Sequence, residues 1–293
     1  MPLLPMRLDE AMQTRAETAG VQKAPQKRAA FYFVAHEDDW QLFMNPSAFY
    51  DVLDAATRTV LIHLTAGDAG LGTNTGGRKH PYYAARENGV ENAIRFMADS
   101  DNRAPGETGV SMPAFNGRQI RRVTYRNTAA YFLRLPDGGT EGDGYAGTKH
   151  QSLQRLAQGQ IRALTAIDGS ASYASWSDLA ATLRGIVDTE REQAPAIHLH
   201  VPETDSKLNP GDHPDHYMTA RVALDATEGL SAHRVHYVGY SSAKSPENLG
   251  AKDRDMKCAA YAVTAAGVLA LDHPMSWQHY DECFAGRSYF RRL

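Results

Sequence analysis

Short apolar segments alternate along this chain with segments of helical periodicity, and that order constrains the fold more than any other feature. The apolar segments are rich in β-branched and aromatic residues, which is typical of strands buried on both faces. They cover residues 29–35, 58–65, 196–201 and 236–240. Helices are expected over 46–56, 82–98, 153–167, 178–191, 213–228 and 256–271, and a strand hairpin over 119–135. We therefore expect an α/β fold with a mostly parallel sheet and helices on both faces.

The 293 residues show no internal repeat, no low-complexity block and no linker, so we expect a single domain spanning 1–293. Residues 1–28 are polar and predict a helical or irregular N-terminal extension, with a short helix over 8–19. Residues 99–147 are rich in Gly, Pro and Asn. We interpret that segment as a loop-rich insertion that shapes the rim of a pocket.

Composition excludes several classes of protein. The two cysteines, Cys258 and Cys283, exclude a disulfide scaffold and a Cys-based zinc finger. A net charge of −3 provides no electrostatic footprint for nucleic acid. The longest apolar runs fall far short of the ~20 residues that a membrane span needs, and the N-terminus turns acidic before a signal peptide could form. We expect a cytoplasmic protein with a small-molecule or glycan substrate; the sequence carries no signal for its oligomeric state.

Charged residues follow the first apolar segment without a break, as His36-Glu37-Asp38-Asp39. Their charge would be costly in the core, so they must lie at the solvent-facing end of the strand. A polar turn that caps the following helix explains this segment alone equally well.

A second cluster follows the third apolar segment, in residues 212–216 (DHPDH). His213 and His216 share a face of the first helical turn, where Pro214 is well tolerated. The other two histidine pairs have no acidic residues nearby in the sequence. His233 and His236 have no acidic neighbours, and His198 and His200 lie among apolar residues. We expect those two pairs to be structural.

The two clusters together are stronger evidence for a functional site than either cluster alone, because the carboxyl ends of parallel strands meet at one edge of a sheet. Two His and one Asp, with a fourth position left to water, make an open zinc site, although the same set also suits iron. A spare Asp can take the proton of the water, and a spare His can stabilise an oxyanion or protonate a leaving group.

Two other functions, phosphate binding by a glycine-rich loop and hydrolysis by an acyl-serine mechanism, do not match the sequence in detail. The segment 72–79 has the glycine spacing of a phosphate-binding loop, but Arg78 stands at the Lys position and Lys79 at the Ser/Thr position. No serine lies in a GxSxG motif, which argues against an acyl-serine hydrolase.

An apolar strand ending in AHxDD, followed much later by HPDH, resembles the PIG-L (LmbE-like) family of zinc-dependent de-N-acetylases. The sequence LTAGDAG after the second strand and the pair Arg86-Glu87 in the next helix also match, so the resemblance spans about residues 30–240. It implies a Rossmann-like α/β fold. It also implies a zinc hydrolase that removes the N-acetyl group from an N-acetylglucosamine-type amino sugar or its conjugate.

The resemblance also implies residue roles. The zinc ligands would be His36, Asp39 and His216. Asp38 would be the general base, and His213 would stabilise the oxyanion or act as the acid toward the leaving amine, with Asp215 orienting it. Asp68 and Arg86 would contact the sugar, although Arg86 and Glu87 could equally form a structural ion pair on their helix.

The sequence departs from the family pattern at two positions. Glu37 replaces the usual Pro and adds a charge near the metal, while the spacing of the ligands is unchanged. Trp40 replaces a residue that is often acidic or aliphatic, and we expect it to stack on a sugar ring or to pack in the core.

Two other functions stay open. One is a zinc amidase on a non-sugar N-acyl amine, because the motif fixes the reaction and not the leaving group. The other is a catalytically inactive, sugar-binding relative. The metal could also be another divalent ion.

Overall fold

The computed structural model describes residues 26–293 except 102, 193 and 276. The helix expected over 8–19 therefore lies outside the described residues.

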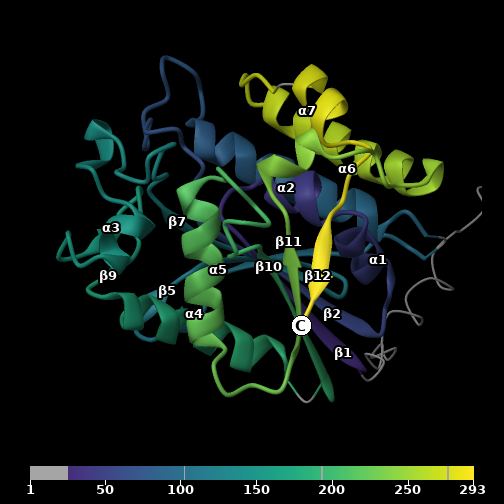
Figure 1. Ribbon diagram of the computed structural model, residues 1–293, viewed down its shortest axis with the longest axis horizontal. Helices are drawn as coiled ribbons and strands as arrows, with labels where there is room; N and C mark the ends of the chain where they lie inside the picture. Colours follow the sequence, from purple (N-terminus) through teal and green to yellow (C-terminus); the bar gives the residue numbers. More distant parts are fainter. Residues whose placement is uncertain (1–25, 102, 193, 276) are drawn as a thin grey trace, which may run out of the picture.

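An eight-stranded sheet forms the centre of the protein, in the order β12-β11-β10-β1-β2-β7-β6-β3 (Figure 1). The five strands from β11 to β7 are parallel to one another, β12 and β6 run antiparallel to them, and β3 pairs antiparallel with β6. The parallel strands are β1 (Arg28–Val34), β2 (Thr57–Thr65), β7 (Thr128–Leu135), β10 (Ala196–Pro202) and β11 (His233–Tyr237). The edge strands are β3 (Thr108–Ser111), β6 (Arg121–Tyr125) and β12 (Phe290–Arg292).

Helices cover both faces of this sheet, as Figure 1 shows. One face packs against α3 (Leu153–Ala157), α4 (Trp176–Glu190) and α5 (Pro214–Ala226). The other packs against α1 (Ser47–Leu53), α2 (Tyr82–Ala98), α6 (Ala251–Leu269) and α7 (Trp277–Cys283). Alternate residues of β1 enter the two cores, with Phe31 and Phe33 on the first face and Tyr32 and Val34 on the second. The expected mixed α/β architecture with a mostly parallel central sheet is confirmed.

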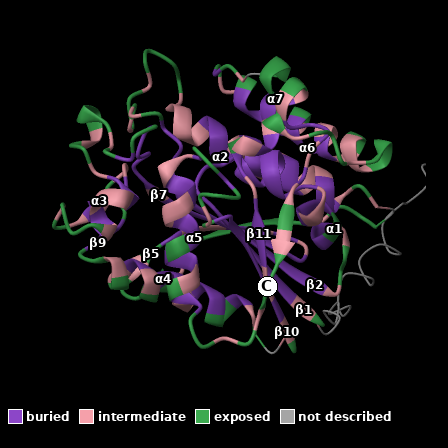
Figure 2. Cartoon of the chain, in the orientation of Figure 1, coloured by how far each residue is buried: buried purple, intermediate pink, exposed green. Residues whose placement is uncertain are grey.

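The buried strands appear as a continuous core in Figure 2, between helices that expose their outer faces. Shorter elements complete the described chain. They are the π-helix η1 (Trp40–Met44), the 3-10 helices η2 (Ala146–Thr148) and η3 (Tyr240–Lys244), and two small hairpins, β4 (Ala114–Phe115) with β5 (Arg118–Gln119) and β8 (Leu164–Thr165) with β9 (Ser172–Tyr173). In residues 26–293, apart from the three gaps, no helix has the length and apolar character to cross a membrane.

Three expectations from the sequence need correction. The segment 99–147 is not simply an insertion, because β3, β6 and β7 from it join the central sheet. The helix expected over 153–167 ends at Ala157, because the chain turns at Gly159, which has a φ of +67°. The last parallel strand begins at His233, three residues earlier than expected, and neither α7 nor β12 was expected.

A buried ion-pair network ties α4 to the sheet. Glu190, the last residue of that helix, binds Arg58 on β2 at 2.6 Å and Arg122 on β6 at 2.7 Å, and it accepts a hydrogen bond from the Tyr131 hydroxyl. Glu190 and Arg58 are both buried. Each charge therefore depends on the other for compensation.

We predict that Glu190→Ala lowers the free energy of unfolding by about 3–5 kcal/mol, because Arg58 is left buried without a counter-charge. The matched control is Asp188→Ala on the same helix, whose ion pairs with Arg184 and Arg191 are partly exposed and are worth about 0–1 kcal/mol. Urea unfolding measures both values. Equal losses in the two variants would contradict the role of the network.

Candidate metal centre and active site

The two charged motifs meet at the carboxyl ends of neighbouring parallel strands. Residues 36–39 follow β1 after Ala35, and residues 212–216 form the end of the loop after β10 and the first residues of α5. Because β1 pairs with β10 on one side and with β2 on the other, the loops after these strands share one edge of the sheet. Ligand sites of open parallel sheets form at such edges.

His36, Asp39 and His216 form a buried group whose ligand-capable atoms all lie within 4.8 Å of one another. The Asp39 Oδ1 atom lies 3.2 Å from His216 Nε2 and 3.6 Å from His36 Nδ1. The second oxygen, Oδ2, accepts the backbone N–H groups of Ala35 (2.9 Å) and His36 (2.8 Å). These two bonds fix the carboxylate so that Oδ1 faces the imidazoles.

The donor atoms fit a metal ion. Asp39 Oδ1 and His216 Nε2 are buried and, apart from their 3.2 Å approach to each other, have no hydrogen-bond partner among the described residues. Buried polar atoms are normally satisfied, so such a pair calls for a missing partner. Two imidazole nitrogens and one carboxylate oxygen are the protein ligands of an open catalytic metal site. This group could therefore hold a metal ion.

Each of the two imidazoles has a second carboxylate near its other ring nitrogen. His216 Nδ1 lies 3.0 Å from Asp212 Oδ2, and His36 Nε2 lies 3.5 Å from Asp215 Oδ2. Metal-ligating histidines commonly donate to a carboxylate in this way, which fixes the tautomer and orients the ring. Asp212 is not among the site residues expected from the sequence. Its signal in the sequence is its spacing, because it stands four residues before His216 and just before the start of α5.

The surrounding carboxylates make this site favourable for positive charge. Burial lowers the pKa of His216, but Asp39 and Asp212 outweigh it and raise the pKa to about 10. The pKa of His36 also rises well above its usual value, because Asp39 and Asp215 outweigh the effect of burial. A metal cation has to displace these protons, so its affinity should increase with pH.

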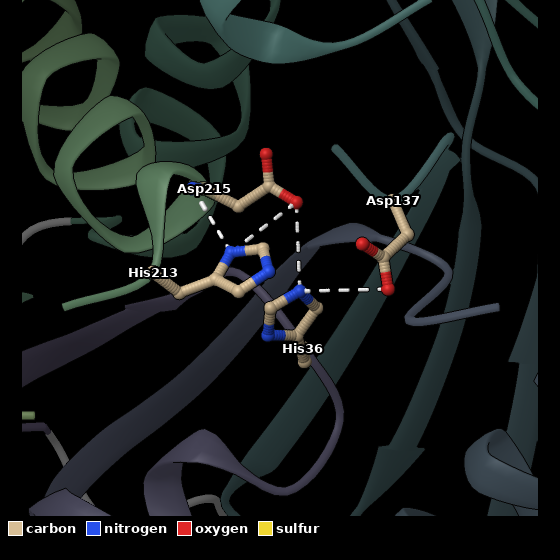
Figure 3. A group of neighbouring side chains, drawn as sticks. All are labelled: His36, Asp137, His213 and Asp215. Carbon is tan, nitrogen blue, oxygen red and sulfur yellow. Dashed lines mark hydrogen bonds and ion pairs between the residues drawn. The ribbon is translucent and has the colours of Figure 1, made fainter. Parts of the chain in front are cut away.

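His213 lies beside His36, and its pKa is lowered whereas the pKa values of His36 and His216 are raised. Its ring is edge-on to that of His36, with 4.8 Å between the ring centroids. Burial and the charge of His36 lower the pKa of His213 to about 4. Its Nδ1 atom accepts the backbone N–H of Asp215 at 3.2 Å, so the neutral ring carries its proton on Nε2 (Figure 3).

The structure changes the role expected for Asp215. Its carboxylate Oδ2 lies 3.8 Å from His213 Nδ1, farther than from His36 Nε2, and accepts the Gly138 N–H at 2.8 Å. The hydrogen bond that orients His213 therefore comes from the Asp215 backbone, while the Asp215 side chain serves His36.

Asp137 brings a further carboxylate to the site, and it forms a second possible metal-binding group with His36, His213 and Asp215 (Figure 3). Asp137 Oδ2 lies 3.9 Å from His36 Nε2, and Asp137 Oδ1 accepts the Gly139 N–H at 2.8 Å. Backbone N–H groups occupy His213 Nδ1 and Asp137 Oδ1 in this second group, while His36 Nε2 and Asp215 Oδ1 have no hydrogen-bond partner among the described residues. The set of two imidazoles and a single carboxylate around Asp39 matches an open catalytic metal site, and it is the group that we take for the metal. Asp137 is not among the residues expected from the sequence, although it is a carboxylate soon after a parallel strand.

Asp38 keeps 24% of its side chain exposed and forms an ion pair with Arg86 Nη2. Arg86 Nε lies 3.2 Å from Glu37 Oε2, and Arg86 Nη1 donates to the carbonyl of Gly67. Burial raises the pKa of Glu37 to about 8. Glu37 is thus buried beside the guanidinium of Arg86.

The residues expected to contact a sugar are engaged elsewhere. Trp40 is fully buried, so the structure corrects the expectation that it stacks on a sugar ring and favours the packing alternative. Asp68 accepts the backbone N–H groups of Asp137 (3.1 Å) and Gly72 (2.7 Å), which joins two loops at the site. Arg86 positions Asp38, and its neighbour Glu87 binds Arg134 at 2.6 Å.

Comparison of the sequence with protein-family models and with curated proteins finds no match. The likeness to the PIG-L family therefore depends on the motif residues themselves.

We predict that His216→Ala loses the bound metal, and that Asp212→Asn weakens metal affinity roughly 10–100-fold because it alters the partner of a ligand. The control is His198→Ala, which removes a histidine on β10 outside both groups. Metal content after loading with zinc and gel filtration, together with titration calorimetry, measures these effects. A full equivalent of metal in His216→Ala would overturn the ligand set.

Proposed function

We propose that this protein is a zinc-dependent hydrolase of the PIG-L (LmbE-like) type that removes the N-acetyl group from an N-acetylglucosamine-type amino sugar or its conjugate. The observation that carries the proposal is the buried group of His36, Asp39 and His216 with unsatisfied donor atoms. Asp38 and the neutral His213 stand beside this group, as a base and a proton donor would.

The metal would be held by His36, Asp39 and His216, and when bound it would lower the pKa of a water toward about 7 and polarise the amide carbonyl. Asp38 accepts the proton of the attacking water, and its ion pair with Arg86 keeps the carboxylate in place. The Nε2–H of His213 donates to the oxygen that gains negative charge or to the nitrogen of the leaving amine. Acetate and a free amine are the products.

A second candidate is a metal-dependent amidase on a non-sugar N-acyl amine. It is favoured by the positions of two residues that were expected to contact a sugar. Trp40 is buried, and Asp68 is occupied by backbone N–H groups. The same residues would carry out the chemistry in both cases.

We predict that Asp38→Asn binds zinc as the wild type does and lowers kcat about 10²–10⁴-fold, because the isosteric amide cannot accept the proton. Asp188→Asn, on the helix α4, is the matched control and should keep the wild-type rate. Acetate release from N-acetylglucosamine derivatives and from N-acetyl amino acids, measured on the zinc-loaded protein, tests both the base and the substrate class. A wild-type rate in Asp38→Asn would show that another group is the base.

A further inference from the structure

We infer that this protein has a second ligand site, separate from the candidate metal centre, which binds the phosphate group of a small molecule. The site is a cavity of about 560 Å³, a volume within the range of small-molecule sites. We name it the basic cavity after the arginines and histidines among its lining residues: Arg28, Arg234, Arg292, His198, His200 and His233. No residue of the two possible metal-binding groups lines it.

The basic cavity lies toward the amino ends of the parallel strands, whereas the metal centre lies at their carboxyl ends. Arg28 is the first residue of β1 and His233 the first of β11. Cross-strand pairing sets His198 of β10 directly beside His233, and it puts Arg292 of β12 in the same row as His200. Residues paired on neighbouring strands point to the same face of a sheet, so these side chains gather on one face.

Positive charge in the basic cavity exceeds what its one acidic side chain can balance. Asp51 is the only Asp or Glu among the lining residues, and it already binds Arg28 at 2.5 Å and the Tyr32 hydroxyl at 2.7 Å. Arg292 forms no ion pair among the described residues, and its guanidinium lies 5.4 Å from the ring centroid of Phe290. This guanidinium is therefore available to an anion.

A buried polar atom in the wall also lacks a partner. His200 has 5% of its surface exposed, and its Nδ1 atom lies 2.9 Å from the Tyr237 hydroxyl. Its Nε2 atom has no hydrogen-bond partner among the described residues, because the Asp51 carboxylate stays 3.8 Å away. Buried polar atoms are normally satisfied, so this atom calls for a ligand or a water molecule in the cavity.

The imidazoles of the basic cavity respond to the same two cations. Burial lowers the pKa of His198, and the charges of Arg28 and Arg292 lower it further. Burial and the same guanidinium groups also lower the pKa of His200, to about 3. Both guanidinium groups are therefore close enough to act on these imidazoles, and a bound anion would offset their repulsion.

The chemistry of the walls favours an anion over a metal ion. The three histidines do not belong to any group of described residues that could hold a metal. Guanidinium groups repel a metal cation, whereas they bind phosphate through paired N–H donors. A phosphate group carries nearly two negative charges at neutral pH and has three acceptor oxygens, so it can accept hydrogen bonds from several converging donors at once.

Aromatic side chains provide a surface for the rest of the ligand. Tyr50 of α1 and Phe290 of β12 both line the basic cavity, and they are 41% and 43% exposed. Rings of this kind stack on planar groups and pack on apolar ones. The site therefore fits a phosphate ester with an organic part better than it fits a bare inorganic anion.

The test measures the Kd of phenyl phosphate for the full chain by titration calorimetry, at pH 7 and constant ionic strength. Benzoate and phenol are the comparison ligands, because they keep the ring and replace the phosphate by a carboxylate or by no charge. We expect phenyl phosphate to bind at least about ten times more tightly than either, a factor that one additional charge-assisted hydrogen bond supplies.

Variants then locate the site. Arg292→Gln should weaken the binding of phenyl phosphate at least about tenfold, and Arg292→Lys, which keeps the charge, should weaken it less. The matched control is Arg221→Gln, which removes a guanidinium that also lies over an aromatic ring, that of Trp176, outside the cavity. His216→Ala, which removes a candidate metal ligand, should bind phenyl phosphate as the wild type does.

Each contrary result has a distinct meaning. A wild-type Kd in a folded Arg292→Gln variant would overturn the assignment of the cavity. Loss of binding in His216→Ala would place the anion at the metal centre and overturn the second site. No binding of phenyl phosphate by the wild type, or equal binding of benzoate or phenol, would overturn the inference and leave the proposed function standing.

Discussion

The fixed orientation of the Asp39 carboxylate is the interaction on which the candidate site depends. Two backbone N–H groups at the end of β1 hold one of its oxygens, so the other must face the buried imidazoles of His36 and His216. A carboxylate buried in this way needs a compensating positive charge. Protons on the histidines supply it in the absence of metal, and a divalent cation would supply it better.

The sheet explains why these groups lie together. β1 is flanked by β10 and β2, and β2 by β7, so the segments that follow β1, β10 and β7 and carry His36, His216 and Asp137 lie at one edge of the sheet. The carboxylates differ in what they contact. Asp39 faces the two imidazoles, Asp212 and Asp215 lie near the other ring nitrogens of these imidazoles, and Asp38 pairs with Arg86.

The sequence predicts the parts of this arrangement that depend on local pattern. Apolar runs mark the buried parallel strands, and the charged motifs after β1 and at the start of α5 mark the three candidate ligands. The partners that come from tertiary contact could not be predicted: Asp137 lies in a glycine-rich loop, and Arg86 pairs with Asp38 rather than with its neighbour Glu87. The burial of Trp40 likewise depends on packing against helices far away in the chain.

The stacking of Tyr261 on Tyr280 could not be predicted either. α7 is short and its sequence is mixed, so its amphipathic pattern is weak, and the stacked rings become apparent only once it packs on α6. The antiparallel β12 is equally short. Local sequence describes the centre of this protein better than its rim, where substrate selection would take place.

A crystal structure of the zinc-loaded protein, with anomalous scattering recorded above and below the zinc absorption edge, tests the central claim most directly. The account predicts one anomalous peak at about 2.0–2.2 Å from Asp39 Oδ1, His216 Nε2 and a ring nitrogen of His36. A peak bound instead by Asp137 and His213, or no peak in these two groups, would contradict it.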